Sequence, residues 1–146
     1  KVVSAEPASS LNLPRLVNHP YRLYPVVDQI ADKVCATLME YKSRASSREK
    51  DLVDLVVLAT THKINGAELS MAITTDIRRR RMDPFGKFTV PTAWGTGYAK
   101  LAKPVPYCAE FRTIESATDL VTRMINPVLS GEAEHKTWSP ESMSWQ

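Results

Sequence analysis

The segment 52–59, LVDLVVLA, constrains the fold more than any other part of the chain, because Asp54 is its only polar residue. A helix that is apolar on nearly every side must be surrounded by other elements. The chain of 146 residues is long enough to build one such core. We therefore expect a single domain in which a buried central helix, ending near Thr61, is packed by its neighbours.

The first of these neighbours is predicted between Pro25, which suits the first turn of a helix, and about Lys42. A short polar turn follows, and Ser46 with Glu49 fits a capping box that begins the central helix. The two helices should therefore form a short-looped hairpin. The apolar stripe of the first helix consists of Val27, Ile30, Ala31, Val34 and Leu38.

Two more helices follow from caps and apolar spacing. Asn65 with Glu68 offers the cap of a third helix, which ends in four consecutive arginines. A last clear helix begins near Thr113, and Asn126-Pro127 is expected to bend or end it. Cations at the end of the third helix complement its dipole.

The remaining segments are shorter. Residues 1–5 resemble the end of a strand, and residues 6–24 an extended connection. Residues 87–90 are predicted as a short strand, and residues 91–102 as a short helix with Trp94, Tyr98 and Leu101 on one side. The segment 131–146, with two tryptophans among polar residues, is expected to be a loosely held tail.

These elements predict an α+β fold that is mainly helical, with at most short strands. We divide the chain into the end of an upstream sheet and a connection (1–24), a helical domain (25–130) and the tail (131–146). Because the chain begins with Lys1 in a short apolar stretch, we interpret it as a fragment of a longer protein.

Composition excludes several classes of protein. The longest uninterrupted apolar run, residues 55–59, is far too short to span a bilayer, and the N-terminus lacks the pattern of a signal peptide, so we predict a cytoplasmic protein. The two cysteines form no CxxC motif, and His19, His62 and His135 lack metal-ligand spacing. No pattern of residues favours a hydrolase. The net charge of +3 is too small to argue for nucleic acid by itself.

The most informative feature is a set of charges within the two helices of the hairpin. Asp51 and Asp54 lie on one face of the central helix, with Arg48 three residues before Asp51. Carboxylates on so apolar a helix need partners, and Lys33 from the first helix is the expected one. Two interpretations remain open: an ion-pair cluster that locks two helices, or a site for an anion or nucleotide.

A resemblance bears on this choice. The sequences YRLYPVVDQIADKVCATL and SSREKDLVDLVVLA resemble the second half of the AbiEii-type nucleotidyltransferase toxins, an abortive-infection family that includes toxins of bacterial toxin–antitoxin pairs. The shared elements are a helix that bears Lys33, and the motif from Arg48 to Asp54, REKDLVD. The resemblance covers roughly residues 20–102 and is most specific across 21–58.

The resemblance implies the C-terminal helical half of a nucleotidyltransferase-like fold, which completes a nucleotide cleft. It implies that Lys33 contacts the triphosphate, that Asp51 is the essential helical carboxylate, and that Arg48 and Lys50 contact phosphate or acceptor. Asp54, the second carboxylate of the motif, would be structural. The implied reaction transfers a nucleoside monophosphate from an NTP to an acceptor, the 3′ end of tRNA, with Mg²⁺ neutralising the phosphates.

The chain also departs from the family pattern. It has no Gly-Ser turn followed by a D-x-D pair, so no metal ligands are predicted within it, and we expect the chain alone to be inactive.

The arginine run offers a further candidate site. Arg78, Arg79, Arg80 and Arg81 are expected to form a solvated helix end, or a tRNA contact if the resemblance holds. The alternative to the enzyme is a non-catalytic helical module that binds RNA or a cognate antitoxin and uses the charges of the hairpin only structurally.

Overall fold

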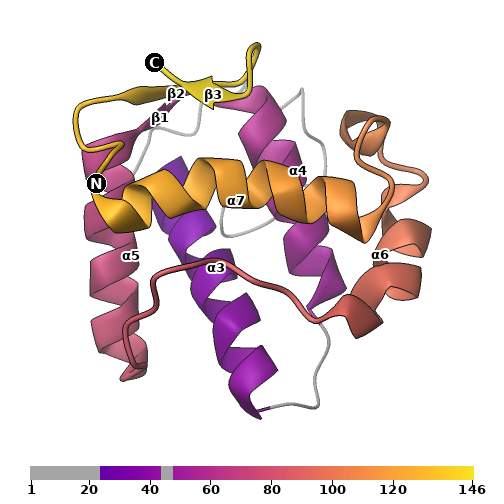
Figure 1. Ribbon diagram of the computed structural model, residues 1–146, viewed down its shortest axis with the longest axis horizontal. Coiled ribbons are helices and arrows are strands. Elements are labelled where there is room, and N and C mark those ends of the chain that lie inside the picture. Colours follow the sequence, from indigo (N-terminus) through magenta and orange to yellow (C-terminus); the bar gives the residue numbers. More distant parts are fainter. Residues whose placement is uncertain (1–23, 44–47) are drawn as a thin grey trace.

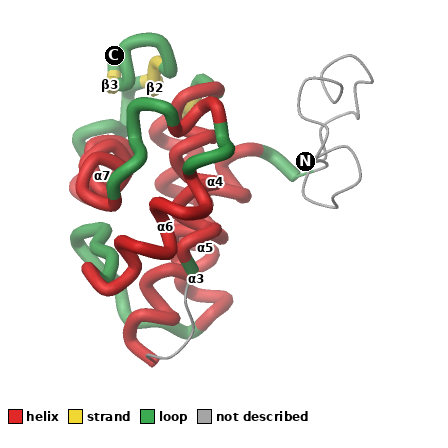
Figure 2. Tube along the Cα trace, turned by 90° about the vertical axis from the view of Figure 1, so that its right-hand side faces the viewer, coloured by secondary structure: helices red, strands yellow, loops and turns green. Residues whose placement is uncertain are grey.

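The computed structural model describes residues 24–43 and 48–146. Helix α4 (Glu49–Thr61) packs against α3 (Val26–Ser43), α6 (Gly95–Ala102) and α7 (Ile114–Ser130). Seven of its residues are buried, which confirms the prediction of a central buried helix. Helix α5 (Gly66–Arg80) lies along the other side of α3. Helix α7 crosses in front of α3 and α4 (Figure 1), and the view turned by 90° shows it as a separate layer (Figure 2).

The two helices of the hairpin begin in different ways. Helix α3 begins directly after Pro25, whose carbonyl accepts hydrogen bonds from the N–H groups of Asp28 and Gln29 at 3.0 and 3.2 Å. Helix α4 begins at Glu49, and its N-cap residue Arg48 makes no side-chain cap. The predicted capping residue Ser46 lies outside the described residues.

Two other predicted caps are confirmed. Asn65 Oδ1 accepts a hydrogen bond from the N–H of Glu68 at 2.9 Å and begins α5. Thr113 Oγ1 accepts one from the N–H of Ser116 at 3.1 Å and begins α7. Helix α7 does not end at Pro127 but continues to Ser130, because only one backbone N–H is lost there.

The connection between α5 and α7 corrects two predictions. Residues 87–90 form no strand: Phe88 is buried and donates its backbone N–H to Asn126 Oδ1 at 3.0 Å instead of to a neighbouring strand. The predicted short helix exists as the 3₁₀ turn η2 (Thr92–Trp94) followed by α6. Its buried side is formed by Trp94, Tyr98 and Ala102, at a spacing of four, so Leu101 faces solvent. A second 3₁₀ turn, η3 (Pro106–Cys108), precedes α7.

A small antiparallel sheet ties the C-terminal segment to the core. Strand β2 (Thr137–Ser139) pairs with both β1 (Ile64–Asn65) and β3 (Ser144–Trp145). The fully buried Trp138 donates its indole N–H to the carbonyl of Ala59 at 2.7 Å and meets the ring of Trp145 edge to face at 5.6 Å. The expectation of a loosely held tail missed this packing, since the polar residues around Trp138 conceal an indole that fills the core.

Gly66 shows how closely this segment approaches α5. A Cβ atom there would lie 1.8 Å from the carbonyl oxygen of Ala133, and the N–H of Gly66 donates to Lys136 O at 2.9 Å. Only glycine permits such an approach. The described residues therefore form a mainly helical α+β fold with short strands, as predicted, and none of their helices is long and apolar enough to cross a bilayer.

Candidate functional site

The α3–α4 hairpin brings Lys33 against two carboxylates of α4. The Lys33 ammonium lies 3.6 Å from Asp51 Oδ1 and 3.1 Å from Asp54 Oδ2. The exposed fractions of these side chains are only 12% for Lys33 and 15% for each aspartate. The predicted partnership of Lys33 with the carboxylates of the central helix is therefore confirmed.

Two more cations approach the same carboxylates from the solvent side. Arg48 Nη1 lies 3.4 Å from Asp51 Oδ2, and Lys50 Nζ lies 3.5 Å from Asp54 Oδ2. Their side chains are 40% and 68% exposed, so both can move in water. We call these five residues the hairpin cluster. Among the described residues, three cations thus contact two carboxylates in this cluster.

The surroundings of Asp51 shift its ionisation. Burial raises the pKa of Asp51 above its ordinary value, and the negative charge of Asp54 adds to this effect. Lys33 and Arg48 oppose it but do not cancel it. The ionised form of Asp51 is thus kept at a cost to the fold, a condition that is common at functional sites and also occurs in structural ion-pair networks.

The distances indicate what the cluster can do chemically. Its four ion pairs span 3.1 to 3.6 Å, longer than the 2.7–2.9 Å that is typical of strong charge-assisted hydrogen bonds. Cations that are held this loosely can exchange a carboxylate for a phosphate oxygen without a change in the backbone. The cluster is therefore suited to an anion, while the catalytic and nucleotide-binding roles of its residues stay predictions.

A second ion-pair cluster, between α3 and α5, was not found from the sequence. Arg80 Nη2 lies 2.6 Å from Asp32 Oδ1, and Arg80 Nε lies 2.8 Å from Asp76 Oδ2. Arg79 also pairs with Asp76, whose side chain is only 7% exposed. We call Asp32, Asp76, Arg79 and Arg80 the Asp76 cluster. The local signals were the i, i+3 spacing of Asp76 and Arg79 and the i, i+4 spacing of Asp76 and Arg80.

The Asp76 cluster holds its charges firmly. Burial acts against the charge on Arg80, but the hydrogen bonds and charges of Asp76 and Asp32 outweigh it and raise the pKa of Arg80. Burial and the neighbouring Asp76 also raise the pKa of the Cys35 thiol to about 12. Cys35 therefore remains a protonated, buried side chain rather than a nucleophile.

This cluster changes the interpretation of the arginine run. Arg78, Arg79 and Arg81 are exposed, and Arg81 adopts a left-handed conformation (φ 58°) that ends α5. Arg80 instead turns toward α3 and is only partly exposed. Arg78 and Arg81 are thus the exposed cations of the run that lie outside the Asp76 cluster, and the prediction of an RNA contact is limited to them.

Within residues 24–43 and 48–146, no group of three or more histidine, cysteine, aspartate or glutamate side chains could hold a metal ion. Asp51 and Asp54 are already paired with Lys33, Arg48 and Lys50.

Comparison with known proteins shows which protein family contains the hairpin cluster. The family model described as nucleotidyl transferase AbiEii toxin, type IV TA system, matches residues 2–141, which include the whole cluster. Neither the comparison with curated proteins nor that with solved structures gave a match. Since the family model covers nearly the entire chain, this protein belongs to the AbiEii nucleotidyltransferase toxin family.

Proposed function

We propose that this chain forms the helical side of the nucleotide site in a toxin that transfers a nucleoside monophosphate from an NTP to the 3′ end of tRNA. The observation that carries the proposal is the hairpin cluster, in which two nearly buried carboxylates hold Lys33 and the partly exposed Arg48 and Lys50 approach from the solvent side. Cations gathered in this way can bind the negatively charged phosphates of an NTP.

Within this proposal, each residue of the hairpin cluster has one role. Lys33 binds a phosphate oxygen of the NTP, and Asp54, its nearest carboxylate, orients the ammonium. Arg48 and Lys50 contact phosphate or acceptor from the solvent side. Asp51 is the essential carboxylate and positions Lys33 and Arg48 relative to the reacting phosphate.

The family membership implies an NTP substrate, and nucleotidyl transfer commonly uses Mg²⁺ to neutralise the phosphates. The described residues provide no ligand set for this ion, so none of the roles above depends on it. We propose further that the protein acts in the cytoplasm beside a cognate antitoxin, and that Arg78 and Arg81 contact tRNA phosphates, since Arg79 is held by Asp76.

Growth arrest and tRNA labelling test this proposal together. The product of the complete gene is expressed with and without Lys33→Ala, and transfer of labelled nucleotide to tRNA is measured with the purified proteins. Lys63→Ala is a matched control, because Lys63 is exposed and lies outside the hairpin cluster. We expect Lys33→Ala to abolish arrest and transfer while the protein stays folded, and Lys63→Ala to retain both.

The same experiment distinguishes the alternative function. Arrest that persists in a folded Lys33→Ala variant would contradict the enzyme and favour a helical module that binds RNA or an antitoxin. For the tRNA contact, the variant Arg78→Glu/Arg81→Glu should weaken tRNA binding and reduce its salt dependence. Unchanged tRNA affinity would refute that contact without affecting the nucleotide site.

A further inference from the structure

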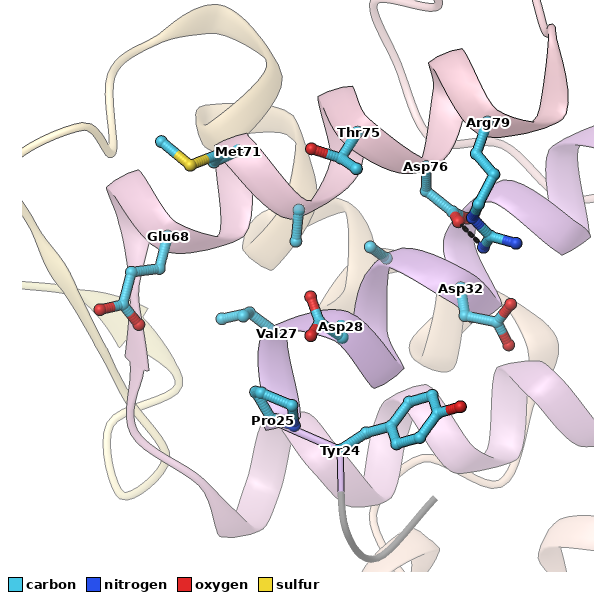
Figure 3. A pocket seen from close by; sticks show the side chains of 12 residues that line it. Tyr24, Pro25, Val27, Asp28, Asp32, Glu68, Met71, Thr75, Asp76 and Arg79 are labelled. Carbon is cyan, nitrogen blue, oxygen red and sulfur yellow. Dashed lines mark hydrogen bonds and ion pairs between the residues drawn. The ribbon is translucent and has the colours of Figure 1, made fainter. Parts of the chain in front are cut away.

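A groove with a volume of about 920 Å³ lies between α3 and α5, on a different side of α3 from the hairpin cluster. Figure 3 shows its two walls: Val27, Asp28 and Asp32 belong to α3, and Glu68, Met71, Thr75, Asp76 and Arg79 belong to α5. Tyr24 lines the groove beside the start of α3. The proposed nucleotide site makes no use of this surface.

The charges that line the groove are mainly negative. Asp28, Asp32, Glu68 and Asp76 contribute four carboxylates, and Arg79 is the one cation of the lining. Asp32 and Asp76 pair with arginines of the Asp76 cluster, so Asp28 and Glu68 supply the remaining negative charge. Within the part of the chain that the structure describes, neither Asp28 nor Glu68 makes an ion pair. Both lie in the first turn of a helix, where acidic residues complement the dipole, so their presence costs the fold little. The groove is thus acidic on a chain whose net charge is +3.

Apolar surface accompanies these carboxylates. Met71 is 71% exposed and Tyr24 is 50% exposed. They are two of the five large apolar side chains that are exposed among the described residues, and both line this groove. A flexible methionine beside an aromatic ring is a common element of protein-binding surfaces.

We propose that this groove binds a segment of a partner protein that presents lysine or arginine next to apolar side chains. The cations pair with Asp28 and Glu68, and the apolar side chains pack on Met71 and Val27. Charge complementarity favours a basic polypeptide and opposes nucleic acid, because carboxylates repel phosphate groups. The occupant is therefore distinct from the tRNA and the nucleotide of the proposed reaction.

Binding of a defined peptide tests the proposal. The probe is a fluorescent 16-residue helical peptide made of leucine and lysine at amphipathic spacing, and its counterpart has glutamate in place of every lysine. The full chain should bind the lysine peptide and not the glutamate peptide, as measured by fluorescence anisotropy. Asp28→Asn/Glu68→Gln should weaken this binding about 5- to 10-fold, the effect expected from two exposed ion pairs.

The control variant Glu110→Gln/Glu132→Gln removes two exposed carboxylates that do not line the groove. It should bind the lysine peptide as the unmodified chain does. Equal weakening in both variants would reduce the effect to net charge and overturn the proposal, as would unchanged binding in Asp28→Asn/Glu68→Gln. Both variants should stay folded at the assay temperature and retain the nucleotide transfer of the unmodified protein, so that this test is independent of the proposed function. A small decrease in the unfolding midpoint is expected for Asp28→Asn/Glu68→Gln, because it removes two charges that complement helix dipoles.

Two other occupants would also be detected. Binding of labelled single-stranded RNA that is changed by Asp28→Asn/Glu68→Gln but not by Glu110→Gln/Glu132→Gln would place nucleic acid in the groove and refute the proposal. A dimer in sedimentation velocity that dissociates in Asp28→Asn/Glu68→Gln would identify a second copy of the chain as the occupant instead of a partner protein.

Discussion

The two ion-pair clusters lie on two sides of α3 and begin from adjacent residues, Asp32 and Lys33. In the Asp76 cluster, two arginines meet two aspartates, and the contacts of Arg80 are 2.6 and 2.8 Å long. In the hairpin cluster, three cations meet two aspartates at 3.1 to 3.6 Å. The contacts of Arg80 in the Asp76 cluster are therefore shorter than every ion pair that the described residues form in the hairpin cluster.

This difference separates a structural ion-pair network from a site that has capacity for a ligand. A buried network is strongly destabilised when one member is removed, because the remaining charge loses its partner. In the hairpin cluster each carboxylate contacts two cations, with Lys33 shared between them, so we expect it to tolerate the loss of one contact. Measurements of the free energy of unfolding for variants of the two clusters can therefore test whether the hairpin cluster stabilises the fold or serves to bind an anion.

The largest effect is expected for Asp76→Ala. The substitution leaves Arg80, which is largely buried, with Asp32 as its remaining carboxylate in the Asp76 cluster. The free energy of unfolding should fall by about 3 to 5 kcal/mol, the typical cost of breaking a buried ion pair. Urea unfolding followed by circular dichroism measures this change. A loss below about 1 kcal/mol would mean that the Asp76 cluster is no tighter than a surface ion pair.

Asp51→Asn makes the matching substitution in the hairpin cluster. Lys33 keeps Asp54 as its nearer carboxylate, and water solvates the partly exposed Arg48. The change also removes the repulsion between the two carboxylates, so the free energy of unfolding should change by no more than about 1 kcal/mol, while nucleotide transfer should be lost. A strong loss of stability would instead assign the hairpin cluster a purely structural role.

The raised pKa of Asp51 should make the stability of the protein depend on pH. The pKa of Asp51 is higher in the folded protein than its ordinary value of 3.8, so the folded state binds this proton more tightly than the unfolded state does. The contribution of Asp51 to the free energy of unfolding therefore falls as the pH rises from about 3.8 through the raised pKa, and is least favourable above it. Relative to Asp51→Asn, the unmodified protein should lose stability across this window in a urea titration at several pH values. A constant difference would mean that the pKa of Asp51 is not raised.

The sequence predicted those features of the two clusters and of the helices that depend on residues close together in the chain. The apolar spacing of α4, the short connection to α3 and the position of Lys33 place the hairpin cluster without any long-range information. The caps at Asn65 and Thr113 were predicted for the same reason, since each depends on residues three positions apart.

The remaining features depend on contacts across long sequence separations. Four consecutive arginines look alike in sequence, and Arg80 differs from the others only because Asp32, 48 positions away, accepts its hydrogen bond. Trp138 is similar: its indole reaches the carbonyl of Ala59 across 79 positions. Strands of two or three residues carry no periodicity, so the sheet that holds this segment could not be predicted.

Lys50→Ala is expected to have the smallest effect on stability and tests directly whether a cation of the hairpin cluster binds phosphate. Its ion pair with Asp54 is an exposed i, i+4 contact, so the free energy of unfolding should change by less than about 0.5 kcal/mol. Lys100→Ala, an exposed helical lysine of α6, is the matched control for helix propensity. If Lys50 is held for a phosphate, Lys50→Ala should weaken the binding of an NTP in a fluorescence titration, and Lys100→Ala should not. Equal nucleotide affinity in the two variants would remove Lys50 from the site and leave Lys33 and Arg48 as its phosphate-binding cations.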